Sequence, residues 1–214
     1  MILLALALGT AGLSLNAAAQ SAEAGAKKAA MCIGCHSIPG YQASFPEIYK
    51  VPMIAGQGDK YIVSALAQYK KGDRKHPTMR AIAASLTDQD MADLAAFYAV
   101  QGKGEATPAA PAAPAAPPTE IAALLAKGNC ASCHGPNYSA PIDPSYPKLA
   151  GQHADYLFVA LKAYQTVDNR TVGRANAVMS GMAKPYTLAE LKQMSAYLAS
   201  LPTDLKTVPQ NRLR

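Results

Sequence analysis

An internal repeat is the feature that most constrains this chain. The segment CIGCH at residues 32–36 returns as CASCH at 130–134, and PMIAGQ at 52–57 returns as PKLAGQ at 147–152. Further features match in the same order, namely Tyr61 with Tyr156, Tyr69 with Tyr164, Met79 with Met179, and Ala96–Tyr98 with Ala196–Leu198. Because the order is kept throughout, the 214-residue sequence predicts two homologous domains in tandem.

A Pro/Ala-rich segment, EATPAAPAAPAAPP, lies between the two copies. Its prolines lack a backbone donor and favour extended polyproline II structure. We therefore predict a linker at residues 105–118, a first domain at 20–104 and a second domain at 119–214. Such a linker would hold the domains apart unless they bind each other directly.

The first 19 residues carry no charge and end in three alanines. This pattern predicts a cleaved export signal at residues 1–19, and hence a periplasmic protein, although the Lys or Arg that usually opens such a signal is absent. An uncleaved membrane anchor is the alternative. It is disfavoured because a spanning helix needs about 20 strongly apolar residues, and this stretch includes Gly, Thr, Ser and Asn.

Within each copy the apolar residues recur with helical spacing. The segments 61–69 and 156–164 each present one apolar face, and shorter helices are expected over 24–31 and 119–127. Capping-box patterns, Thr87-x-x-Asp90 and Thr187-x-x-Glu190, open the last helix of each copy. No run alternates like a β-strand, so the predicted fold is all-α.

The spacing C-x-x-C-H has a direct chemical meaning. Two cysteines three residues apart lie on one side of a helical turn, where their thiols can add to the two vinyl groups of a haem, and the next residue can offer an imidazole to the iron. The sequence therefore predicts two covalently bound haem c groups. The residues that would hold them are Cys32, Cys35 and His36 in the first copy and Cys130, Cys133 and His134 in the second.

Three other uses of paired cysteines fit less well. A thioredoxin-like redox site would need a βαβ pattern, which is missing. A zinc site would have to join two pairs that belong to separate domains. Structural disulfides suit an exported chain but leave the repeated histidine unexplained.

A simple electron-carrying haem needs a sixth ligand, and the Met thioether is the usual choice. Met79 and Met179 lie 43 and 45 residues after their histidines, in the loop expected before each last helix. Met182 is a rival for Met179, but Ile82 takes its place in the first copy. The unmatched Met31, Met53, Met91 and Met194 are expected in the cores, and the unmatched His76 and His153 on the surface or in hydrogen bonds.

The formal charge of +6 does not indicate a nucleic-acid-binding protein. Two haems would add about four propionate charges, and the basic residues form only short clusters. We expect these clusters to be solvated helix ends, and the alternative is that some steer acidic redox partners. The clusters are Lys27/Lys28, Lys70/Lys71 and Arg74/Lys75.

Together, these motifs resemble class I cytochromes c, and closely the dihaem cytochrome c4 family, from Ala24 to Leu201. The resemblance implies that the four cysteines are thioether anchors. It also implies that the carbonyls of Pro52 and Pro147 accept the Nδ1 proton of the ligating histidines. The axial pairs would be His36 with Met79 and His134 with Met179.

Members of this family carry electrons in the periplasm, typically from a cytochrome bc complex towards a terminal oxidase. The resemblance thus implies a non-enzymatic carrier whose partners are redox proteins, with peripheral membrane association left open. The alternatives are an electron-accepting subunit of a periplasmic dehydrogenase and a dihaem enzyme such as a peroxidase. Two departures from the family are the longer linker and the 16-residue spacing from His36 to Pro52, against 13 from His134 to Pro147.

Overall fold

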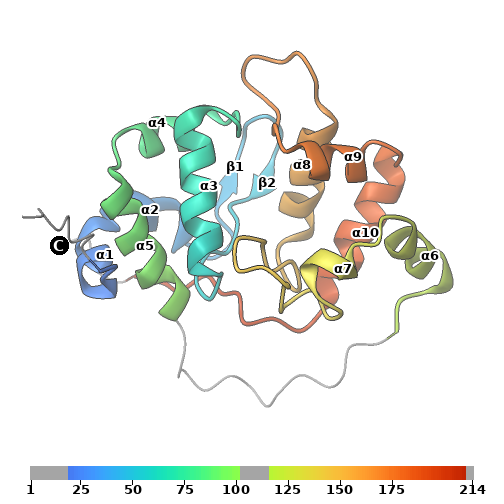
Figure 1. The fold of residues 1–214 in the computed structure, drawn as a ribbon, viewed down its shortest axis with the longest axis horizontal. Helices are drawn as coiled ribbons and strands as arrows, with labels where there is room; N and C mark the ends of the chain where they lie inside the picture. The colour runs from blue at the N-terminus through green and yellow to red at the C-terminus, as the bar shows by residue number, and fades with distance from the viewer. Residues whose placement is uncertain (1–18, 102–115, 211–214) are drawn as a thin grey trace, which may run out of the picture.

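The computed structural model describes residues 19–101 and 116–210, which form two helical halves lying side by side (Figure 1). The predicted signal segment, apart from its last residue, and most of the predicted linker lie outside these ranges. The first half contains α1 Ala22–Lys28, α2 Ala30–His36, α3 Asp59–Lys71, α4 Pro77–Ala84 and α5 Asp88–Val100. The second contains α6 Thr119–Lys127, α7 Ala131–His134, α8 Ala154–Gln165, α9 Ala177–Ala183 and α10 Leu188–Ser200.

The last helix of each half begins as its sequence predicts. In α5 the Thr87 hydroxyl accepts the backbone N–H of Asp90, and the Asp90 carboxylate accepts the backbone N–H of Thr87. Thr187 and Glu190 form the same capping box at the start of α10. These caps satisfy backbone donors that the first helical turn leaves unpaired.

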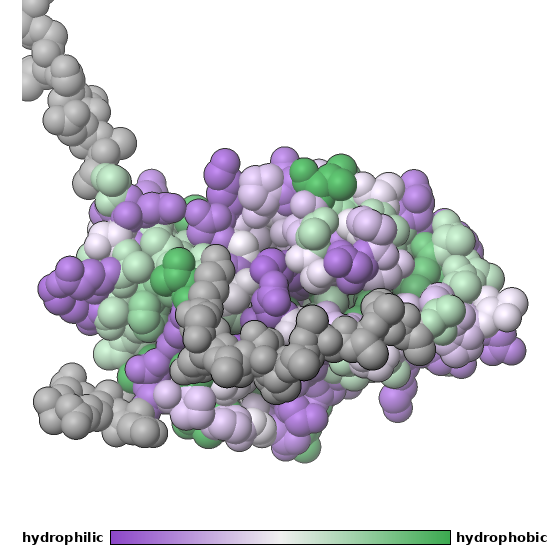
Figure 2. Space-filling model, turned by 90° about the horizontal axis from the view of Figure 1, so that it is seen from below, coloured by the Kyte–Doolittle hydropathy of each residue, from purple (hydrophilic) through white to green (hydrophobic). Residues whose placement is uncertain are grey.

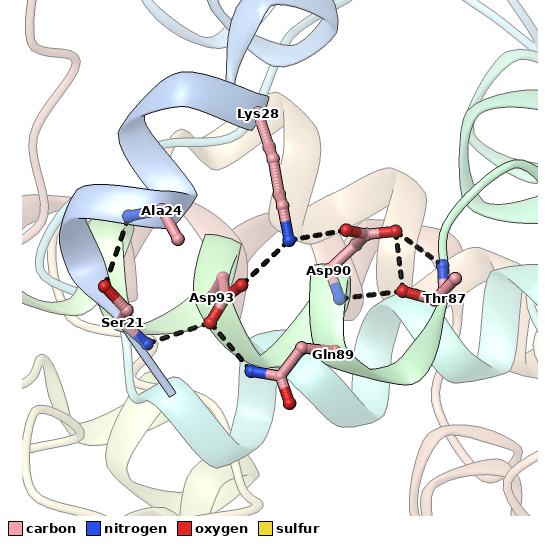
Figure 3. A network of polar contacts seen from close by, with 7 residues as sticks. All are labelled: Ser21, Ala24, Lys28, Thr87, Gln89, Asp90 and Asp93. Atoms are coloured by element: carbon pink, nitrogen blue, oxygen red, sulfur yellow. Dashed lines mark hydrogen bonds and ion pairs between the residues drawn. The ribbon is translucent and has the colours of Figure 1, made fainter. Parts of the chain in front are cut away.

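Helix α1 packs closely against α5 in the first half. Gly25 lies at the crossing, where an added Cβ would come within 2.1 Å of the Asp93 carbonyl oxygen. Figure 3 shows Lys28 of α1 reaching between Asp90 and Asp93 of α5, with Nζ–O distances of 2.6 and 2.8 Å. The hydrogen bond from Lys28 holds the pKa of Asp93 below its ordinary value, and the backbone N–H of Ser21 adds to this effect. The ion pairs of Lys28 with Asp90 and Asp93 therefore join the first and last helices of this half.

Each half has its own apolar core, built mainly where its last helix meets the others. The first core includes Ile62, Leu86, Met91, Leu94 and Tyr98, and the second includes Leu125, Leu157, Leu191, Met194 and Leu198. Met91 and Met194 are buried as predicted. Met31 is 50% exposed, so its prediction as a core residue is wrong: it lies on the outer face of α2.

A small antiparallel hairpin departs from the expectation of no strands. Strands β1 Gln42–Ala43 and β2 Tyr49–Lys50 pair with Ala43 opposite Tyr49. They lie in the stretch between His36 and Pro52 that is longer than its counterpart in the second half. Two-residue strands have no detectable alternation, and the fold remains the predicted mainly helical one.

The two halves bind each other directly, and two repeated glutamines form much of the contact. Gln57 donates to the carbonyl of Lys148 at 3.1 Å and accepts that residue's backbone N–H at 2.9 Å. Gln152 donates to the carbonyl of Met53 at 2.9 Å and accepts its N–H at 3.0 Å. Both glutamines are buried. The predicted linker therefore joins domains that are docked.

No helix among residues 19–101 and 116–210 is long and apolar enough to cross a bilayer. On the face seen in Figure 2, hydrophilic and hydrophobic residues are intermixed over both halves, and the strongly hydrophobic ones lie in separate spots.

Candidate haem sites

The first cysteine–histidine motif forms the end of α2. Cys32, Cys35 and His36 are partly buried, and His36 Nδ1 lies 2.9 Å from the carbonyl oxygen of Pro52. Because this carbonyl accepts the Nδ1 proton, the lone pair of the imidazole is on Nε2. Burial lowers the pKa of His36, although the Pro52 carbonyl opposes that shift. The ring is therefore a neutral imidazole, the form that binds a metal.

The second motif repeats this arrangement on α7. His134 is buried, and its Nδ1 lies 3.1 Å from the carbonyl oxygen of Pro147. Burial again lowers the pKa of the histidine, opposed by the proline carbonyl. Both histidines thus present Nε2 as a metal-binding atom, each oriented by a proline from the repeated segment.

No disulfide joins any of the four cysteines in the described residues. Burial raises the pKa of Cys32 and of Cys130, so these sulfurs are protonated near neutral pH until they form a covalent bond. No cluster of three or more His, Cys, Asp or Glu side chains suited to a metal ion occurs in the described part of the chain. The cysteine pairs are therefore placed for attachment of a group beside each histidine and are not joined into one zinc centre.

Met79 and Met179 lie in short helices, so their expected position in loops is wrong. Met79 is in α4 and Met179 in α9, and each backbone N–H is accepted by the side chain that caps its helix. The cap is His76 in the first half, at 3.3 Å, and Asn176 in the second, at 2.9 Å. The rival Met182 is 43% exposed, whereas Met79 and Met179 are partly buried. Ligation of iron by Met79 and Met179 stays a prediction.

Arg74 and Arg174 form a site between the two halves that the sequence prediction missed. Arg74 was expected in a solvated cluster but is only 5% exposed. Its guanidinium lies over the rings of Tyr61 and Tyr69, and it donates to the Tyr61 hydroxyl at 3.2 Å. Arg174 lies in the same way over two tyrosines, Tyr156 and Tyr164.

The backbones of these two arginines also meet. Lys75 donates its N–H to the Gly173 carbonyl at 2.9 Å, and Ala175 donates to the Asp73 carbonyl at 2.7 Å. The signal for this site was present in the sequence, because each arginine lies five residues before the repeated methionine. The meeting of the two arginines at the interface depends on how the halves dock, and the repeat in the sequence does not predict that docking.

The arginine pair has a charge that nothing in the described residues balances. No carboxylate of residues 19–101 or 116–210 lies within ion-pair distance of either guanidinium. Two neighbouring cations in a partly buried place favour an anionic neighbour, because burying a charge without a partner is costly. The two propionates that each haem carries would supply such anions. The residues present therefore fit haem at both its iron and its carboxylate end.

Comparison with known proteins agrees with this geometry. The family model for cytochrome c matches twice, at residues 22–99 and 118–202. Cytochrome c4 of Azotobacter vinelandii is 31% identical over 212 residues, which cover 94% of this chain and 98% of that protein. A thiosulfate dehydrogenase electron acceptor of Stutzerimonas stutzeri (strain A1501) is 30% identical over 216 residues, covering 90% of this chain and 93% of that protein.

Solved structures lead to the same family. The crystal structure of reduced recombinant cytochrome c4 from Pseudomonas stutzeri superposes with a TM-score of 0.61 at 28% identity. The match covers 86% of this chain and 100% of the Pseudomonas stutzeri chain. The predicted cofactors, two covalently bound haem c groups, are confirmed by this family membership. The chain belongs to the cytochrome c family and, within it, to the dihaem cytochromes of the c4 type.

Proposed function

We propose that this dihaem cytochrome is a periplasmic carrier of single electrons, in which each domain holds a haem through one histidine and one methionine. The residues that would hold the iron are His36 with Met79 and His134 with Met179. The observation that carries the proposal is the pair of equivalent histidines, each with Nδ1 bound to a proline carbonyl and Nε2 left for iron. The domain limits 20–104 and 119–214 belong to the same proposal.

Bound haem supplies an iron that accepts and releases one electron. The chain's own residues set how readily it does so. The carbonyls of Pro52 and Pro147 orient the imidazoles and make them better donors to the metal. A methionine thioether favours the reduced iron and raises the potential. Arg74 and Arg174 would offset propionate charge, because no carboxylate of the described residues is paired with either guanidinium.

A carrier function needs no open coordination position, and the predicted ligand set leaves none. All four cysteines are used in the two attachment motifs, so none remains as an axial thiolate. Met79 and Met179 would supply the second ligand to each iron. A dihaem peroxidase, by contrast, has to free one iron for its substrate, which this ligand set does not favour.

The partners are proposed to be redox proteins. A cytochrome bc complex and a terminal oxidase fit a respiratory shuttle. A periplasmic dehydrogenase is a second candidate donor, favoured by the relative that is a thiosulfate dehydrogenase electron acceptor. The periplasmic location rests on the predicted export signal at residues 1–19.

Spectroscopy and kinetics on the purified holoprotein test the carrier function. We expect low-spin ferric haems, rapid one-electron reduction of both irons, and no turnover of hydrogen peroxide. A high-spin ferric signal together with peroxide turnover would show an enzyme with an open iron. To choose between donors, reduction by a cytochrome bc complex is compared with reduction by a thiosulfate dehydrogenase under the same conditions.

A further inference from the structure

We propose that His76 is a positioning residue for Met79, and that the Tyr49 hydroxyl holds His76 from its other side. Through these two residues the β1–β2 hairpin, which is docked on the second domain, would fix the ligand-bearing segment of the first haem. The proposal rests on the function proposed above, because it takes Met79 to be the sixth ligand.

Both ring nitrogens of His76 are engaged. Nδ1 accepts the backbone N–H of Met79 at 3.3 Å, and Nε2 lies 2.9 Å from the hydroxyl oxygen of Tyr49. With Nδ1 accepting, the neutral ring carries its proton on Nε2 and donates it to that oxygen. The ring also meets Phe45 and Tyr69 edge to face, with centroids 6.3 and 6.4 Å away. His76 is therefore held in one orientation while it caps α4.

Tyr49 is itself fixed, because it belongs to β2 and is only 6% exposed. Its ring lies 6.2 Å from that of Tyr156 in α8. The hairpin around it is attached to the same helix at two further points. The backbone N–H of Lys50 donates to Asp155 at 3.0 Å, and Lys162 pairs with Glu47 at 2.8 Å. The chain of contacts thus runs from Met79 through His76 and Tyr49 to the second domain.

The second domain is built differently at the equivalent place. Asn176 caps α9 and accepts the Met179 N–H at 2.9 Å. Its side chain is too short to reach beyond the cap as an imidazole does. The second domain also has the shorter spacing after its histidine, and between His134 and Pro147 no strand occurs. Met79 and Met179 therefore occupy matching positions in the sequence, but the cap of Met79 is held by a further hydrogen bond to Tyr49, and the cap of Met179 has no such strand beside it among the described residues.

The difference has a measurable consequence for the iron ligands. A methionine leaves ferric iron when its segment moves away and an added ligand such as imidazole takes its place. In the first domain this movement has to break the His76 contacts or pull on the docked hairpin. Replacement should therefore be slower at the first haem than it would be without His76 or Tyr49.

The test compares His76→Asn, which installs the residue that the second domain uses, with Tyr49→Phe, which removes only the hydroxyl. Imidazole is added to the ferric holoprotein, and the loss of each haem's own methionine NMR signals is followed in time. We expect replacement at the first haem to be on the order of fivefold faster in both variants, the size associated with one lost hydrogen bond. The second haem of the same molecule should be unchanged.

A matched control is Tyr41→Phe, the same change at an exposed tyrosine next to the hairpin. This variant should behave as wild type. The double variant His76→Asn/Tyr49→Phe should be no faster than the single ones, because both changes break one chain of contacts. Unchanged rates at the first haem in both single variants would overturn the proposal, and so would equal acceleration at both haems.

Failure of this proposal is distinct from failure of the ligand assignment. If Met79→Ala leaves the methionine signals of both haems intact, Met79 is not a ligand and the proposed ligation fails. If Met79→Ala removes one set of signals while His76→Asn and Tyr49→Phe have no effect, the ligand assignment holds and only the positioning role is overturned.

Discussion

Replacing both Gln57 and Gln152 with alanine should weaken the docking of the two domains. Each amide is buried at the interface and makes two hydrogen bonds to backbone groups of the other domain, at 2.9 to 3.1 Å. At roughly 1 kcal/mol for each bond, the loss of four bonds weakens docking by about 4 kcal/mol. Since about 1.4 kcal/mol changes an equilibrium constant tenfold, the equilibrium constant for docking should fall by almost three orders of magnitude.

Small-angle X-ray scattering of the holoprotein measures this change, because separated domains have a larger radius of gyration than docked ones. Gln193→Ala is the control, since Gln193 is an exposed residue of α10. We expect the double variant to expand and the control to keep the wild-type profile. A double variant with the wild-type radius of gyration would refute the role assigned to the two glutamines.

Three further predictions concern the first domain and the interface. Gly25→Ala should lower the free energy of unfolding by about 1–3 kcal/mol or more, because the new methyl would overlap the carbonyl of Asp93. Gly34→Ala, where nothing lies within 4 Å of the added Cβ, should not cause this overlap, and urea unfolding compares the two. Asp93→Asn should destabilise the protein at neutral pH. Because Lys28 lowers the folded-state pKa of Asp93, its contribution is present above the ordinary value of 3.8 and is lost as the pH falls below it. Unfolding curves of variant and wild type should therefore converge in acid, and a constant difference would contradict the ion-pair explanation. Arg174→Gln should lower the haem reduction potentials, since a lost positive charge favours the ferric state, and an unchanged redox titration would contradict that.

The sequence was informative wherever a local pattern had a local consequence. The capping boxes at Thr87 and Thr187 and the helix over 119–127 could be predicted because neighbouring residues define them. The register between the copies likewise placed His36 and His134 in equivalent positions. In both, Nδ1 faces the repeated proline carbonyl.

What the sequence did not show depends on contacts between distant segments. Arg74 was expected to be solvated because charged residues usually are, but it is buried over Tyr61 and Tyr69 of its own domain, and its backbone pairs with that of Arg174 in the other. Gln57 and Gln152 were visible as part of a repeated segment, but their amides act across an interface. The hairpin at Tyr49 is too short to produce a periodic signal.

Each domain is proposed to hold its own haem through one histidine and one methionine at equivalent positions of the repeat. The most direct test records the methionine NMR signals of the reduced holoprotein in wild type and in the Met79→Ala, Met179→Ala and Met182→Ala variants, after a haemochrome assay of haem per chain. We predict two haems and two sets of signals in wild type. One set should vanish with Met79→Ala, the other with Met179→Ala, and neither with Met182→Ala. Loss of a set in Met182→Ala, or a single haem per chain, would contradict the account.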